Sequence, residues 1–214
     1  MAGENLAQVE RNIVQARGYT VSAISGALTV VAANGHVFGL RNVATDVEGV
    51  PSGNLGSRAV TEALVVTSVR VRFATTTAFG AAQSLLFRGY KVRGFTAIHT
   101  TGGTAVRAHY KRPNQVPGAA SFRAPLTDIS AYMADTGAIT GQTLTAQTAL
   151  EPEFVAVGAG SVLPGVYEDW EPGALSLPHA LQPDEGLLFD VGLTMGATGV
   201  GNLFIDVECH RPNL

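Results

Sequence analysis

The stretch Val65-Val-Thr-Ser-Val-Arg-Val-Arg-Phe73 carries the clearest secondary-structure signal of the 214-residue chain. From Ser68 onward, apolar residues alternate one by one with polar residues, and two of the polar ones are Arg70 and Arg72. Side chains of a β-strand point alternately to its two faces, so a period of two indicates one buried face and one polar face. This stretch therefore predicts a half-buried strand with an arginine-bearing outer face.

The same alternation recurs twice near the C-terminus, where acidic residues take polar positions. Residues 187–195 and 203–210 predict two antiparallel strands that close the domain, and Gly196–Gly201 turns the chain between them. Residues 85–95 predict a further strand, whose change of phase near Gly89 indicates a β-bulge. Together these patterns predict a set of core-facing residues: Val65, Val69, Val71, Phe73, Leu187, Phe189, Val191, Leu203, Ile205 and Val207.

Two local signals lie nearer the N-terminus. Residues 1–18 have apolar residues at helical spacing, with Asn5 able to cap the start and Gly18 able to end the helix, so they predict a short N-terminal helical arm. Such an arm has too narrow an apolar face to fold alone, so we expect it to dock on its own domain or on a neighbour. Further on, Asn34-Gly35 favours the positive φ angles of a two-residue turn and predicts a hairpin joining residues 27–33 to 36–43.

The whole chain has many short strand patterns and turn signals about every ten residues. Residues 44–61 predict a long surface loop, and residues 113–178 predict long connections with brief strands at the apolar runs 138–150 and 154–157. This combination favours an all-β fold, namely an antiparallel β-sandwich. A jelly roll is the first choice within that class, because its two sheets exchange strands from both ends of the chain. The predicted organisation is an arm at residues 1–18 and a single β-sandwich domain at residues 19–214.

Composition narrows the class of protein further. With 46% hydrophobic residues the chain has ample material for a core. No apolar run approaches the roughly 18 residues that a membrane-spanning helix needs, and the N-terminus lacks the pattern of a secretory signal. The single cysteine, Cys209, excludes an intramolecular disulfide framework. We therefore expect a protein that is made in, and soluble in, a reducing cytoplasm, with no membrane partner.

Charge is sorted along the chain. Residues 58–123 hold ten basic side chains and one acid, whereas residues 124–214 hold twelve acids and one base, so the two blocks have net charges of +9 and −11. Opposite blocks attract, either within the fold or between neighbouring subunits. Twelve of the fourteen basic residues are arginines, which suit interface ion pairs, although a high-GC genome also favours arginine codons.

Residue patterns typical of enzymes are not recognisable. The glycine-rich turns are not followed by a helical pattern, no serine lies in a Gly-x-Ser-x-Gly motif, and the adjacent acids lie in predicted loops. His99 and His109 lack neighbouring ligands at metal-binding spacing. The basic block could follow a phosphate backbone, but it has few interleaved aromatics and the whole chain is anionic. We therefore expect no cofactor, no metal and no direct nucleic-acid binding.

Two segments resemble virion structural proteins of tailed bacteriophages. One runs Phe87-Arg-Gly-Tyr-Lys-Val-Arg-Gly-Phe-Thr-Ala-Ile-His-Thr-Thr-Gly-Gly-Thr-Ala-Val-Arg107. The other comprises Leu181-x-Pro-Asp-Glu-Gly-Leu-Leu-Phe189, then Gly-Ala-Thr-Gly199, then Asn-Leu-Phe-Ile-Asp-Val-Glu208, and it is also similar to the closing strands of jelly-roll decoration proteins. The resemblance brings no catalytic or binding motif whose residues could be transferred.

This resemblance implies a non-enzymatic protein of the virion, made in the host cytoplasm, and in the first place a capsid decoration (cement) protein. Its expected partner is the major capsid protein or another virion protein, and such proteins are often trimers at local threefold positions. One alternative is a tail, baseplate or receptor- or glycan-binding component, for which Trp170 and Tyr132 are the candidate aromatic residues. A second alternative is a cytoplasmic enzyme of unknown activity.

The charge blocks supply the candidate interface residues. If basic strand faces meet acidic surfaces, the contacts are expected at sheet rims or subunit boundaries, and each exposed pair is worth roughly 0.2–1 kcal/mol. The predicted interface residues are Arg70, Arg72, Arg88, Arg93, Glu168, Asp169, Trp170 and Glu171.

Overall fold

The computed structural model describes residues 18–29, 31–43, 45–46, 58–59, 63–78, 83–97, 101–110, 129–158, 166–170, 179–196 and 198–211. Within these ranges the chain forms fourteen β-strands and no helix, which confirms the predicted all-β class. The predicted helical arm lies outside the described residues except for Gly18, which begins the first strand.

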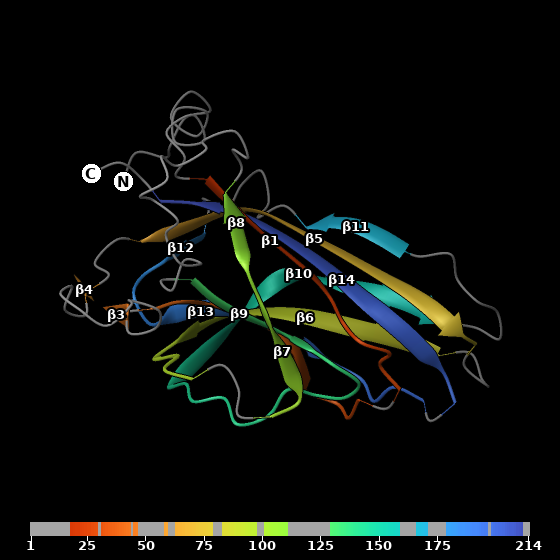
Figure 1. Cartoon of the computed structure of the whole chain (residues 1–214). Helices are drawn as coiled ribbons and strands as arrows, with labels where there is room; N and C mark the ends of the chain where they lie inside the picture. The colour runs from red at the N-terminus through yellow and green to blue at the C-terminus, as the bar shows by residue number, and fades with distance from the viewer. Residues whose placement is uncertain are drawn as a thin grey trace, which may run out of the picture.

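Two six-stranded antiparallel sheets make up most of the structure (Figure 1). Sheet A has the strand order β11 (Val166–Trp170), β5 (Leu64–Thr77), β14 (Val200–His210), β1 (Gly18–Ile24) and β8 (Ala108–Tyr110), and β12 (His179–Leu181) also pairs with β5. Sheet B has the order β10 (Ala146–Gly158), β6 (Gln83–Arg93), β13 (Glu185–Val191), β2 (Gly35–Asn42), β9 (Ile129–Ala134) and β7 (Gly103–Val106). A separate pair is formed by β3 (Thr45–Asp46) and β4 (Arg58–Ala59).

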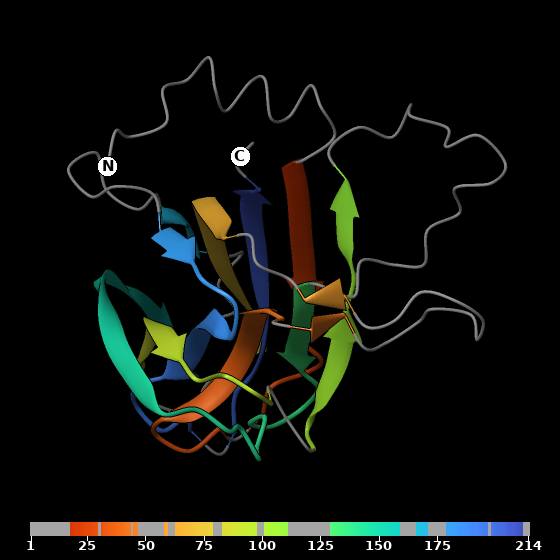
Figure 2. The ribbon, with the colours of Figure 1, turned by 90° about the vertical axis from the view of Figure 1, so that its left-hand side faces the viewer.

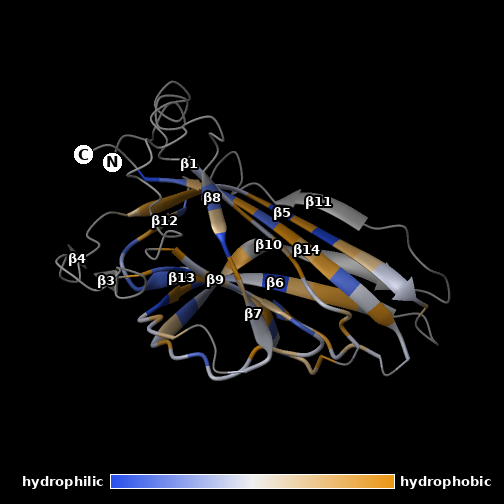
Figure 3. Ribbon diagram, viewed as in Figure 1, coloured by the Kyte–Doolittle hydropathy of each residue, from blue (hydrophilic) through white to orange (hydrophobic). Residues whose placement is uncertain are grey.

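One large apolar core joins the two sheets, which Figure 2 shows as layers seen from one end. Phe73 of β5 and Phe87 of β6 contact each other across the layers, with ring centroids 5.3 Å apart. Nine of the ten predicted core residues are buried, and Figure 3 shows the alternation of hydrophobic and hydrophilic residues along β5 and β14. Burial of apolar surface on this scale is the main stabilising contribution to such a fold.

Val65 is the exception among the predicted core residues. It is half-buried, whereas its neighbours Leu64 and Val66 are fully buried. The register between β5 and β14 shifts between Glu208 and Cys209, so one extra residue in β5 reverses the alternation upstream of Val69. A bulge of this kind moves every preceding side chain to the opposite face.

The predicted hairpin at Asn34-Gly35 is wrong, and the turn that forms lies one residue earlier, at residues 33–34, with Gly35 already in β2. Asn34 has a φ of 63°, and the Gly35 amide donates to the Ala32 carbonyl. The residues before this turn do not pair with β2, because the chain crosses from β1 in sheet A to β2 in sheet B. The two C-terminal strands are separated in the same way, since β13 belongs to sheet B and β14 to sheet A.

The phase change near Gly89 has a different cause from the one predicted. The register of β6 with β13 is continuous through Gly89, and the irregularity lies on the other neighbour, between Leu150 and Phe154 of β10. Beyond Gly89 the buried residues of β6 belong to a second apolar cluster. Its members are Tyr90, Val92, Phe95 and Leu188, with Tyr132 and Leu144 packed against them.

One side of the molecule is crossed by two consecutive strands. β7 pairs with β9 in sheet B and β8 pairs with β1 in sheet A, so the segment 103–110 runs from one layer to the other (Figure 2). The opposite edges of the two sheets are β10 and β11, each of which pairs with a single neighbour among the described strands.

Candidate interaction surfaces

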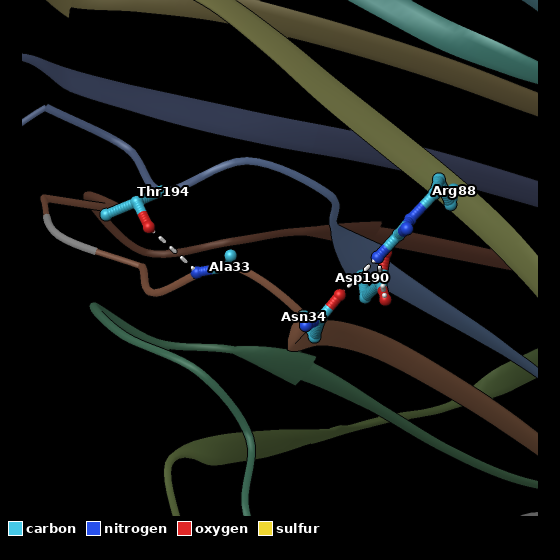
Figure 4. Close-up of polar contacts among 5 residues, drawn as sticks. All are labelled: Ala33, Asn34, Arg88, Asp190 and Thr194. Carbon is cyan, nitrogen blue, oxygen red and sulfur yellow. Dashed lines mark hydrogen bonds and ion pairs between the residues drawn. The ribbon is translucent and has the colours of Figure 1, made fainter.

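Arg88 of β6 forms three side-chain hydrogen bonds, to Asp190 and Asn34 (Figure 4). It lies opposite Asp190 of β13, and its Nε and Nη2 atoms each donate to a carboxylate oxygen of Asp190 at 3.0 Å. Nη2 also donates to the side-chain carbonyl of Asn34. The Asp190 side chain is only 3% exposed, whereas that of Arg88 is 24% exposed. A bidentate arrangement of this type is the strong form of a carboxylate–arginine contact.

Two backbone amides of the turn at residues 33–34 bond to β13 and to the loop that follows it. The Asn34 amide donates to the Val191 carbonyl at 2.7 Å, and the Ala33 amide donates to Thr194 Oγ1 at 3.1 Å. These bonds hold the turn before β2 against the end of β13 and the loop that follows it, and Figure 4 shows the one between Ala33 and Thr194. Arg88 therefore joins β6 to β13 and to the turn before β2, three segments that are far apart in sequence, and we call this contact the Arg88 clamp.

A second charged group lies at the opposite end of β13. Glu185 accepts ion pairs from Lys91 Nζ at 2.9 Å and from Arg93 Nε at 3.2 Å. Lys91 Nζ also donates to the Ala180 carbonyl at 2.7 Å. Because Lys91 belongs to sheet B and Ala180 to β12 of sheet A, this lysine links the two sheets.

The local electrostatics shift two pKa values in this group. Burial alone would raise the pKa of Glu185, but the Gln182 amide and the positive charges of Lys91 and Arg93 outweigh it and lower that pKa below its ordinary value. Burial, followed by repulsion from Lys91, lowers the pKa of His179. Glu185 is therefore stabilised in its charged form and His179 in its neutral form.

The outer face of sheet A presents a different pattern. Arg70 of β5 lies in register with Asp206 of β14 on one side and with Asp169 of β11 on the other. Two residues further along β5, Arg72 is in register with Phe204, and its guanidinium carbon lies 4.9 Å from the centre of the Phe204 ring. Both arginines are exposed. The basic and acidic blocks of the sequence are thus neighbours within one sheet.

The eight predicted interface residues do not converge on one surface. Arg70 and Arg72 are in sheet A, whereas Arg88 and Arg93 are in sheet B. The backbone of β11 contains Glu168, Asp169 and Trp170, and Glu171 lies outside the described residues. Of the predicted charges, Arg70 of β5 and Asp169 of β11 are brought into register.

Sequence reasoning missed the partners on β13. Asp190 was expected on an acidic outer face, and it does lie on the outer face of sheet B, but it is buried beneath Arg88. Glu185 was expected among the adjacent acids in predicted loops, but it begins β13 and pairs with Lys91. The available signal was the opposite charge of two predicted strands, which an antiparallel pairing of β6 with β13 converts into adjacent ion pairs.

None of the described residues forms a cluster of three or more side chains suited to hold a metal ion. The described part of the chain also has no helix with both the length and the apolar character needed to cross a membrane. No protein-family model matches the chain, and no curated protein matches it.

Proposed function

We propose that this chain is a non-enzymatic structural protein of a tailed-phage virion, namely a capsid decoration protein that binds the assembled head and stabilises it. The observation that carries the proposal is the order of strands in the two sheets, combined with the sequence resemblance of residues 87–107 and 181–208 to virion proteins. Virion localisation and a partnership with the major capsid protein follow from the same proposal.

The strand order supports assigning the fold to the jelly-roll class of β-sandwiches. Leaving aside the short additions, sheet A has the order β1-β14-β5-β11 and sheet B the order β2-β13-β6-β10. First and last strands are therefore neighbours in each sheet, and most successive strands alternate between the sheets, as in two superposed Greek keys. Viral capsid domains are among the proteins built on this plan, as are lectins and cupins, so the fold alone does not decide the function.

The roles of the charged side chains favour a structural protein over an enzyme. On sheet B, Arg88, Lys91 and Arg93 are engaged with carboxylates of β13 in cross-strand ion pairs. These contacts hold strands and sheets together, and they do not converge on a common point where a substrate could bind.

The alternative of a receptor- or glycan-binding component receives less support from the aromatic residues. Tyr132 is half-buried and packs against both apolar clusters, so it serves as a packing residue of β9. Trp170 belongs to the edge strand β11. A glycan site built on aromatics would need them on exposed loops.

The proposal includes self-association, with a trimer at local threefold positions of the head as the preferred form, and no direct contact with nucleic acid. Association through closed symmetry is the usual way in which a small structural protein multiplies weak contacts with a large assembly.

The test uses purified particles from a phage that encodes the chain. Mass spectrometry of separated heads and tails is expected to find the chain in heads, and heads from a deletion strain should bind the purified protein and regain heat resistance. Recovery in the tail fraction would favour the tail or baseplate alternative instead. Absence from both fractions would contradict any virion role.

A further inference from the structure

The outer face of sheet A combines an exposed apolar residue, Ile24, and a half-buried one, Phe204, with charges of both signs. Ile24 is 57% exposed and lies in register with Phe204, which is itself in register with Arg72. Asp206 lies two residues along β14 from Phe204, so its side chain is on the same face. We call Ile24, Phe204, Arg72 and Asp206 the sheet A patch.

Neither charge of the patch has an ion-pair partner among the described residues, although Arg70 lies in register with Asp206. Among the described residues, Arg72 makes only its contact with the Phe204 ring, and Asp206 has no ion-pair partner. The nearest register neighbours of Arg72 are Phe204 and Tyr167, neither of which is anionic. On sheet B, by contrast, Arg88, Lys91 and Arg93 each have a carboxylate partner.

The backbone around the patch is well fixed. The side-chain amide of Asn202 donates to the carbonyls of Ser25 and Gly26, at 3.1 and 3.0 Å, which ties the start of β14 to the end of β1. Stacking on Phe204 holds the Arg72 guanidinium above the sheet. Association through this face would therefore order few side chains that are still free, which lowers its entropic cost.

We infer that the sheet A patch binds the same patch of a second copy of this chain. In a pair related by a twofold axis, residue i contacts residue j and j contacts i, so the interface must complement itself. This patch does so, because Arg72 of each copy can meet Asp206 of the other while Ile24 and Phe204 pack between the two charge pairs. Aromatic residues and arginine are also the types enriched at protein interfaces.

This contact is distinct from the proposed trimer and does not depend on the proposed virion role. A face that has both a cation and an anion can pair with the same face of a second copy about a twofold axis. A threefold ring, in contrast, needs two different faces on each subunit. A trimer that has this contact as well would be joined to its neighbours through its sheet A faces.

The test exchanges the two charges by mutation. Sedimentation velocity on the full chain, over a range of concentrations, measures the dimerisation of each variant. Arg72→Asp and Asp206→Arg should each weaken dimerisation by at least about tenfold, since each places two like charges against each other. The double variant R72D/D206R should restore it, because the exchanged charges pair again across the interface. Arg107→Asp makes the same change of charge at an exposed position between β7 and β8, and it should leave dimerisation unchanged.

Circular dichroism and thermal unfolding of each variant establish that loss of the dimer is not loss of the fold. A wild-type chain that stays monomeric at all concentrations, or a folded double variant that stays monomeric, would overturn the inference. A trimer that is indifferent to all four variants would also overturn it, while leaving the proposed function intact.

Discussion

Arg72 and Arg88 lie on the outer faces of the two sheets, but their surroundings differ. Arg88 forks onto the buried carboxylate of Asp190 and is bonded to Asn34, whereas Arg72 is exposed and stacks on Phe204. Sheet B has in addition a second apolar cluster around Leu188, while the corresponding face of sheet A exposes Ile24. The outer face of sheet B therefore contributes to the fold, and that of sheet A is the face we propose for contacts outside the subunit.

The difference has an origin in topology. Segments 94–97 and 139–145 lie beside the end of β6, through bonds such as the Thr96 amide to the Thr143 carbonyl, and Leu144 covers the second cluster. No described segment covers Ile24 in this way. A sheet face that other segments cover can bury apolar residues and charge pairs, and an uncovered face cannot.

The largest effect is expected for Leu188→Ala. Leu188 is fully buried in the second cluster, so the substitution removes apolar contacts and leaves a cavity, and it should lower the free energy of unfolding by about 2.7–5 kcal/mol. The matched control, Ile24→Ala on the outer face of sheet A, should change it by less than about 0.5 kcal/mol. Chemical denaturation measures both. A small loss for Leu188→Ala would mean that the second cluster is not packed as described.

The next effect concerns the Arg88 clamp. Asp190→Asn keeps the shape of the side chain but removes the charge that Arg88 contacts twice, so stability should fall by roughly 1.5–3 kcal/mol. Asp206→Asn makes the same change on sheet A, where the carboxylate has no ion-pair partner among the described residues, and it should be close to neutral. Equal losses from the two substitutions would remove the distinction between the faces.

Local pattern was enough to predict much of the fold. The alternation at residues 69–73, 187–191 and 203–207 identified nine buried residues, because the face on which a strand residue lies depends only on its position in the strand. The positive φ at Asn34 was also predictable, since a turn is decided within about four residues.

Features that depend on a distant partner were not predictable. The misplacement of Val65 comes from a bulge defined only by pairing with β14, and the failed hairpin comes from the sheet that β2 joins. Burial of Asp190 depends on Arg88, which is 102 residues away in sequence. The charge sorting predicted attraction between the basic and acidic blocks. It did not predict that opposite charges would form ion pairs between β6 and β13 of sheet B, while charged residues of β5 would stay exposed on sheet A.

A smaller effect is expected from acidification, and it concerns His179 of β12 in sheet A and Glu185 of β13 in sheet B. His179 has a lowered pKa, so below its ordinary value of 6.5 the unfolded chain binds more protons than the folded chain, and stability falls. The lowered pKa of Glu185 gives a second loss of stability as the pH falls below its ordinary value of 4.5, when Glu185 is protonated and its contacts with Lys91 and Arg93 weaken.

Denaturation midpoints measured from pH 7.5 to pH 3.5 should therefore fall in two stages. His179→Gln should flatten the first stage and Glu185→Gln the second. A profile that both His179→Gln and Glu185→Gln leave unchanged would show that other groups determine the acid sensitivity.

The smallest effect on folding is expected for Arg72→Ala. The guanidinium over Phe204 is an exposed cation–π contact, worth about 0.5–1 kcal/mol, and no ion pair within the described residues is lost with it. Arg72→Lys retains the charge but loses planar stacking, so it should cost about the same or slightly less. Urea denaturation in dilute protein solution, where self-association does not contribute, measures the difference. A loss above about 2 kcal/mol would place Arg72 with Arg88 among the residues that hold the fold, and the outer face of sheet A would no longer be the one left free for a partner.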